Sequence, residues 1–145
     1  MKASELAIGD WVCVAGPFIN GEERLTPPMR VVSIGETWVC LLIDPEQGDP
    51  FDHDIKDIRP IPLTHDIMYK NFKEWQKRSN LYWVGWSNSN ERSITHELSI
   101  EWRYPRWVFT LHEYTYPGNN ITVHYVHELQ HALRLAGIDK EIELL

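Results

Sequence analysis

Residues 94–104 read Ile-Thr-His-Glu-Leu-Ser-Ile-Glu-Trp-Arg-Tyr. Apolar and polar side chains alternate along this stretch, and His96 is the one polar residue on the apolar side. This period is typical of a β-strand that has one buried and one hydrated face. Pro105 ends the alternation, and Trp107, Phe109 and Leu111 resume it. The second half of the chain is therefore predicted to be an antiparallel β-meander, with Tyr104 on its buried face.

Further strands are predicted on both sides of this stretch. Residues 81–86 precede it as an aromatic, β-branched run. The Pro-Gly-Asn-Asn sequence at 117–120 predicts a turn that leads into a short strand at 121–123. The alternating tail 140–144 predicts a last edge strand.

A C-terminal helix is predicted to close the meander over about residues 125–136. Val126, Leu129, Leu133 and Ala136 recur at helical spacing and form one apolar stripe. Gly137 follows as a natural C-terminal cap. We expect Leu129 and Leu133 to be buried.

The N-terminal half, residues 1–62, predicts a small antiparallel β-barrel-like lobe. The run Ile8-Gly9-Asp10-Trp11-Val12 resembles the first strand of small Src-homology-type barrels. Gly16-Pro17 is predicted to end this strand, and Gly35-Glu36 to turn a hairpin. The acidic stretch 44–57 is predicted to be a loop. The predicted strands are 6–15, 29–34, 37–43 and the proline-containing edge segment 58–63.

Residues 63–145 are predicted to form the second lobe, which begins with a linking helix. Thr64 is a good N-cap, and apolar residues recur at helical spacing after it. Because about sixty residues of short strands are marginal alone, we expect the two lobes to share one core. The predicted fold class is thus α+β.

The composition of the chain limits the classes of function that it can have. The formal charge is −7, so weak or no binding to generic duplex DNA is expected, while a basic protein partner remains open. The start of the chain does not resemble a secretion signal and no apolar run has the length of a membrane span, which favours a cytoplasmic protein. Cys13 and Cys40 lie in apolar β-forming runs and are predicted to be buried thiols rather than a redox pair.

Two segments together resemble a known family. They are Arg59-Pro60-Ile61-Pro62-Leu63-Thr64 and Val126-His127-Glu128-Leu129-Gln130-His131-Ala132-Leu133-Arg134, combined with the Ile-Gly-Asp opening. They resemble a family of small uncharacterised proteins from gut anaerobic bacteria and from their prophages and conjugative elements. The resemblance implies a cytoplasmic protein of mobile-element origin, and it implies no activity.

The sharpest candidate site is His127-Glu128-Leu129-Gln130-His131, an H-E-x-x-H pattern on the predicted last helix. Histidines at i and i+4 share a helix face and can chelate zinc, while the glutamate can activate a bound water. The usual third ligand is missing, since Arg134 stands where a glycine should precede a third histidine, although Glu141 lies within reach of the helix. The favoured interpretation is an exposed helix face with two hydrated histidines, without metal or other cofactor.

A second candidate is a basic–aromatic surface. Arg103 and Arg106 flank Trp102 in an otherwise acidic chain, and aromatic rings can stack on bases or sugars. The competing interpretation places most of the seven tryptophans on inward faces.

The sequence as a whole favours a non-catalytic accessory or interaction protein, and it leaves the partner unknown, with a protein among the candidates. Two alternatives remain open. One is a zinc-dependent hydrolase that uses His127, Glu128 and His131, and the other is a nucleic-acid-binding module that uses the barrel or the surface around Trp102.

Overall fold

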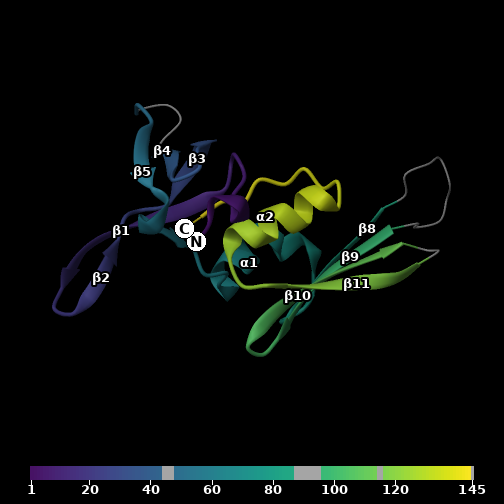
Figure 1. Cartoon of the computed structure of the whole chain (residues 1–145). Helices are drawn as coiled ribbons and strands as arrows, with labels where there is room; N and C mark the ends of the chain where they lie inside the picture. Colours follow the sequence, from purple (N-terminus) through teal and green to yellow (C-terminus); the bar gives the residue numbers. More distant parts are fainter. Residues whose placement is uncertain (44–47, 87–95, 114–115, 145) are drawn as a thin grey trace. The chain divides into compact units, whose positions relative to one another are not determined.

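The chain is a mixed α+β protein with antiparallel sheets (Figure 1). The computed structural model describes residues 1–43, 48–86, 96–113 and 116–144. None of the helices in these ranges combines the length and the apolar composition needed to cross a membrane. Two compact units divide the chain: Met1–Pro62 with Tyr125–His131, and Leu63–His124 with Ala132–Leu145.

The first unit contains one sheet in the order β2-β1-β3-β4-β5, and β6 also pairs with β1. Its elements are η1 (Ala3–Glu5), β1 (Trp11–Ile19), β2 (Glu22–Leu25), β3 (Met29–Ile34), β4 (Trp38–Leu42), β5 (Phe51–Asp54), η2 (Ile55–Asp57) and β6 (Ile58–Pro60). The antiparallel lobe is confirmed, but closure into a barrel is wrong. Among the described strands β2 and β5 are the two ends of this strand order, and no pairing joins them.

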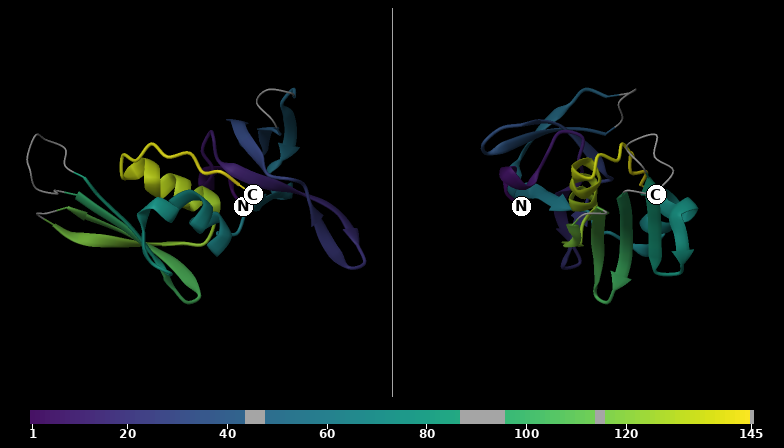
Figure 2. Two further views of the ribbon diagram at one scale, coloured as in Figure 1. Left: turned by 180° about the vertical axis from the view of Figure 1, so that it is seen from behind. Right: turned by 90° about the vertical axis from the view of Figure 1, so that its right-hand side faces the viewer.

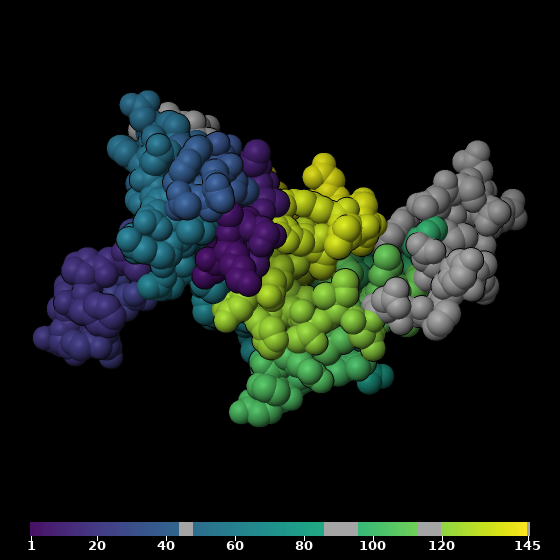
Figure 3. All heavy atoms as spheres, viewed as in Figure 1, coloured from purple at the N-terminus to yellow at the C-terminus, as the bar shows by residue number. Residues whose placement is uncertain are grey.

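The β1–β2 hairpin extends further than the sequence predicted. Gly16-Pro17 does not end β1, which bulges between Ala15 and Phe18 and continues to Ile19. Asn20 and Gly21 then turn the chain with φ angles of 54° and 81°. Two residues with positive φ are what a tight hairpin turn requires, so the Asn-Gly signal outweighs Gly16-Pro17. Figure 3 shows this hairpin standing out from the rest of the first unit.

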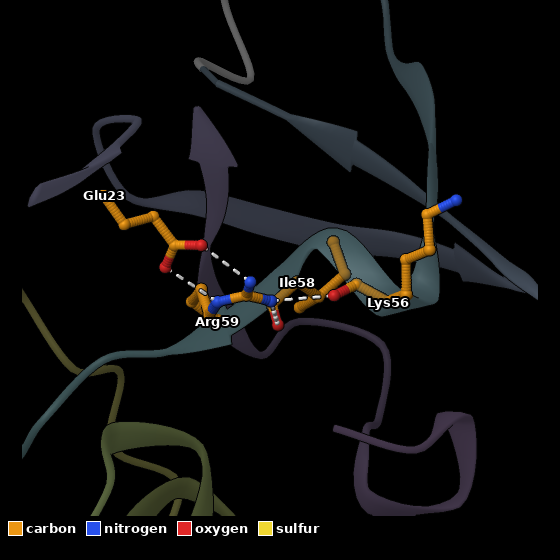
Figure 4. A network of polar contacts seen from close by, with 4 residues as sticks. All are labelled: Glu23, Lys56, Ile58 and Arg59. Atoms are coloured by element: carbon orange, nitrogen blue, oxygen red, sulfur yellow. Dashed lines mark hydrogen bonds and ion pairs between the residues drawn. The ribbon is translucent and has the colours of Figure 1, made fainter. Parts of the chain in front are cut away.

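Arg59 ties this hairpin to the segment around β6 (Figure 4). Its Nε and Nη2 donate to the two carboxylate oxygens of Glu23 at 3.0 and 2.8 Å. Its Nη1 donates to the carbonyl oxygens of Lys56 and Ile58 at 2.7 and 3.2 Å. A two-pronged guanidinium–carboxylate pair restricts direction as well as distance, so it ties β2 to the segment around β6.

The core of the first unit consists of apolar side chains from η1 to β6: Leu6, Val12, Val14, Met29, Val31, Val39, Leu41 and Ile58. Cys13 is buried as predicted, whereas Cys40 is only half-buried, because it lies on the outer face of β4 opposite Asp52. The predicted acidic loop is partly wrong. Residues 44–47 lie outside the described residues, but β5 and η2 occupy 51–57, since Phe51–Asp54 pair with β4.

The second unit contains the predicted meander, in the order β11-β10-β9-β8-β7 (Figure 2). Its elements are α1 (His65–Phe72), η3 (Lys73–Trp75), β7 (Gln76–Arg78), β8 (Leu81–Trp86), β9 (His96–Arg103), β10 (Arg106–Glu113) and β11 (Tyr116–Val123). Thr64 caps α1 as predicted, since its hydroxyl accepts from Ile67 N–H at 3.3 Å. Leu98, Ile100, Trp107 and Phe109 are buried on the sheet, which confirms the inward face.

Three local predictions for the second unit are wrong. The turn at 117–120 lies inside β11, because the register pairs Glu113 with Tyr116, and an edge strand tolerates Pro117. Tyr104 is 87% exposed, since it stands in the β9–β10 turn rather than on the sheet. Residues 140–144 form no strand; Glu143 N–H instead donates to Asn71 Oδ1 at 2.8 Å.

The last helix, α2 (Val126–Leu135), has the predicted apolar stripe. Val126, Leu129 and Leu133 are almost completely buried. The helix ends in a glycine cap, with Gly137 at φ 73° and Ile138 N–H donating to Leu133 O at 2.9 Å. This bond pattern is the one by which a left-handed residue closes a helix.

Leu133→Ala should lower the free energy of unfolding by about 2–5 kcal/mol, because it opens a cavity at a fully packed site. Leu135, two residues away on α2 and 80% exposed, provides the matched control. Leu135→Ala should change stability by no more than about 0.5 kcal/mol. Denaturant unfolding of both variants measures the difference, and equal effects would show that the stripe is not packed.

Candidate functional site

Glu128 occupies the third position of α2 and caps the helix start. Its Oε2 accepts from the backbone N–H of Tyr125 at 3.2 Å. This is the glutamate half of a capping box, in which a side chain satisfies a donor that the helix itself cannot pair. The residue that would act as general base in a zinc peptidase therefore has a structural contact in this chain.

His131 is held by a buried carboxylate. Its Nε2 lies 2.8 Å from Oδ2 of Asp10, which is completely buried. Ala7 N–H donates to the same oxygen at 2.7 Å. Because a carboxylate only accepts hydrogen bonds, the imidazole must carry its proton on Nε2. Nε2 then has no lone pair for a metal, and Nδ1 is the ring nitrogen that could bind one, as in metal sites whose histidine donates its other N–H to a carboxylate.

Gln130 joins the start of α2 to the segment before β1. Its Oε1 accepts from Trp11 N–H, and its Nε2 donates to Gly9 O, both at 3.0 Å. The amide thus satisfies one backbone donor and one backbone acceptor on either side of Asp10. Leu129 and Gln130 occupy the two variable positions of the H-E-x-x-H pattern. Leu129 is buried in the core, and Gln130 holds α2 against the segment before β1.

His127 is buried, with 5% of its surface exposed. Its ring stacks on Tyr125 at 5.9 Å between centroids and 14° between planes. Among the described side chains, its Nδ1 is a buried polar atom that has no hydrogen-bond partner. Burial lowers the pKa of His127, and it outweighs the opposing charges of Glu128, Asp10 and Glu5. The ring is therefore neutral at pH 7.

A cavity of about 460 Å³ lies beside these residues in the first unit. Its lining side chains are Met1, Glu5, Pro60, Tyr125, His127, Glu128 and His131. The volume falls in the range of small-molecule sites in proteins. Two imidazoles and two carboxylates thus share one hollow.

The rings of His127 and His131 lie close together on α2. Their ring centroids lie 5.9 Å apart with planes at 81°. In the part of the chain that the structure describes, no group of three His, Cys, Asp or Glu side chains is placed to hold a metal ion. The zinc hypothesis for His127 and His131, with Glu128 as base, stays untested by these contacts.

The predicted exposed helix face is wrong at His127. Histidines at i and i+4 share one helix face, and that face was expected to be exposed. His127 is buried there, and His131 contacts Asp10. Asp10 and Glu5 were missed as site residues, because Asp10 lies 121 positions from His131. No local pattern signals such a pairing.

The basic–aromatic candidate in the second unit is half-buried and partly neutralised. Trp102 packs edge-on against His65 at 4.9 Å and lies 5.2 Å from Trp107. Arg103 Nε donates to Glu101 at 2.6 Å, and Arg106 is exposed in the next strand. Part of the positive charge that a nucleic-acid site would use is therefore paired within the sheet.

Fewer tryptophan side chains are buried than the sequence predicted. Where the side chain is described, only Trp107 is fully buried, and Trp38 is 41% exposed. Trp38 lies directly opposite Asp54 on β4 and β5. Its indole packs over Gly35, where an added Cβ would come within 2.3 Å of the ring. This exposed ring is thus held in place beside an acidic strand.

The chain was compared with known proteins at three levels. No protein-family model, no curated protein and no solved structure matches it. Its function is therefore inferred from its own residues.

We predict that His127 makes the folded protein sensitive to acid. Because its pKa is lowered from 6.5 in the folded state, the unfolded chain binds the proton first as the pH falls. The stabilisation is present above pH 6.5 and is lost below it, by up to about 1.4 kcal/mol per pH unit. His127→Leu should flatten this part of the stability–pH curve.

Chemical denaturation between about pH 7.5 and 5 measures the effect, since the ordinary histidine pKa is near 6.5. His112→Leu, a change at an exposed histidine on β10, is the control and should keep the wild-type slope. Parallel curves for wild type and His127→Leu would show that His127 is not buried in its neutral form.

Proposed function

We propose that this chain is a non-catalytic interaction protein that binds a basic protein partner through its first unit. The observation that carries the proposal is the distribution of charge. The first unit contains five Lys and Arg against twelve Asp and Glu, whereas the second unit contains nine of each. The whole formal charge of −7 therefore belongs to the first unit.

The contacts of the H-E-x-x-H segment support the non-catalytic part. Glu128 caps α2, Gln130 bridges two backbone groups, and His131 pairs with Asp10. A catalytic site needs an open metal position and a glutamate directed at bound water. These side chains are engaged in holding the first unit together, which favours a structural role for the motif.

The β4–β5 edge supports the binding part. Trp38 and Phe51 are exposed aromatic residues there, and Asp52 and Asp54 lie beside them on β5. Lys56 pairs with Asp54 at 3.1 Å, so Asp52 is the stronger candidate for an intermolecular contact. Aromatic rings attract cations, and edge strands can pair with a further strand. Such an edge suits a lysine- or arginine-rich segment, and a mobile-element origin remains the proposal drawn from the family resemblance.

Binding of fluorescein-labelled decalysine, measured by anisotropy at about 0.05 M salt, tests the charge argument. Asp49→Asn with Asp52→Asn should weaken binding about three- to tenfold, since two exposed charges are lost. The control, Glu74→Gln with Glu143→Gln, removes two exposed charges from the second unit and should change binding less than about twofold. Equal losses in the two variants, or no binding by wild type, would contradict the proposal.

Zinc retention tests the non-catalytic part separately. After incubation with zinc and dialysis, we expect far less than one zinc per chain, because a two-histidine pair leaves most of the coordination shell to water. The comparison variant is His127→Ala with His131→Ala. Stoichiometric zinc that this variant loses, together with a hydrolysis that Glu128→Gln abolishes while zinc stays bound, would make the hydrolase hypothesis right.

A further inference from the structure

The cavity beside α2 contains an unsatisfied polar atom. His127 is 5% exposed and lines the cavity, yet its Nδ1 has no hydrogen-bond partner among the described residues. Leaving a buried polar atom unpaired costs about 1–3 kcal/mol. A neutral imidazole offers either a donor or an acceptor at this position. A bound polar group would recover that lost interaction.

The charged side chains around the cavity determine whether it attracts a cation or an anion. Glu5 and Glu128 both line it, and the buried Asp10 lies directly behind His131. At most two positive charges, on His131 and on the amino group of Met1, stand against these three carboxylates. An anion would therefore be repelled, whereas a cation would be attracted.

The remaining lining suits an organic cation better than a metal ion. Tyr125 and Pro60 add aromatic and apolar surface. Metal coordination needs several donors converging on one point, and in the described ranges no three such side chains converge. An ammonium or guanidinium group instead needs separate acceptors and an aromatic face, which this lining provides.

We propose that this cavity binds an alkylammonium or guanidinium group, with Glu5 as its counter-ion and His127 Nδ1 as a hydrogen-bond acceptor. The group can belong to a free small amine or to a lysine or arginine side chain of another protein. The site is separate from the β4–β5 edge, so the inference goes beyond the proposed protein-binding function and does not depend on it.

Titration calorimetry of the full chain with agmatine, which carries both groups, tests the inference. We expect a dissociation constant of about 0.1–1 mM, as for a ligand of this size, and a shift of the His127 ring signals in NMR spectra. Glu5→Gln and, separately, His127→Leu should each weaken binding about tenfold. Glu22→Gln, the same change at an exposed residue of β2, should leave binding unchanged.

The source of the group follows from a second titration. Tighter binding of acetyl-Gly-Arg-Gly-amide than of agmatine would assign the cavity to a protein side chain, and the reverse order would assign it to a free amine. Either order supports the inference. Absence of agmatine binding up to about 10 mM, well beyond the expected range, or equal binding by Glu5→Gln, would overturn it.

Zinc provides the last discriminating measurement. Uptake of one zinc per chain that requires His127 and displaces agmatine would overturn the organic-cation assignment in favour of a metal. The Asp49→Asn and Asp52→Asn variant, which tests the proposed protein-binding edge, should bind agmatine as wild type does. Failure of one proposal is thus distinguishable from failure of the other.

Discussion

The buried carboxylate of Asp10 is the constraint on which the first unit depends. A carboxylate removed from water must be matched by donors, and the donors to Asp10 include the Ala7 N–H and the His131 imidazole. Its backbone carbonyl also accepts from Val31 N–H at 2.9 Å, which links the same residue to β3. Gln130 adds bonds to the residues on each side of Asp10. The start of α2 is therefore specified by polar contacts as well as by apolar burial.

These contacts explain how a peptidase-like pattern can serve a structural purpose. Three of the four polar residues in the pattern satisfy donors or acceptors of the fold: Glu128 at the helix start, Gln130 on the backbone and His131 on Asp10. His127 is the exception, because it is buried next to a cavity with one ring nitrogen unpaired. Three residues of the pattern thus make contacts within the fold, and the fourth, His127, can still make a polar contact with a ligand.

Charge divides the chain along the same boundary as its two units. The first unit holds the entire net negative charge, and the second is formally neutral. Within the first unit, Arg59 pairs with Glu23 and Lys56 with Asp54, so two of its five cations are used internally. The excess of carboxylates in the first unit favours cationic partners, both for the exposed β4–β5 edge and for the cavity beside α2.

The sequence by itself determined the elements whose signals are local. The alternation of apolar and polar residues at 96–103 predicts β9, and the helical spacing of Val126, Leu129 and Leu133 predicts α2. Gly137 predicts the end of that helix. These signals are local because each depends on the side chains or the backbone conformation of only a few neighbouring residues. Only the tertiary structure decided which strands meet, which is why the predicted barrel is open at β2 and β5. It also decided the site. The burial of His127 and the pairing of His131 with Asp10 arise from packing between segments 121 residues apart, and no local period records such a contact.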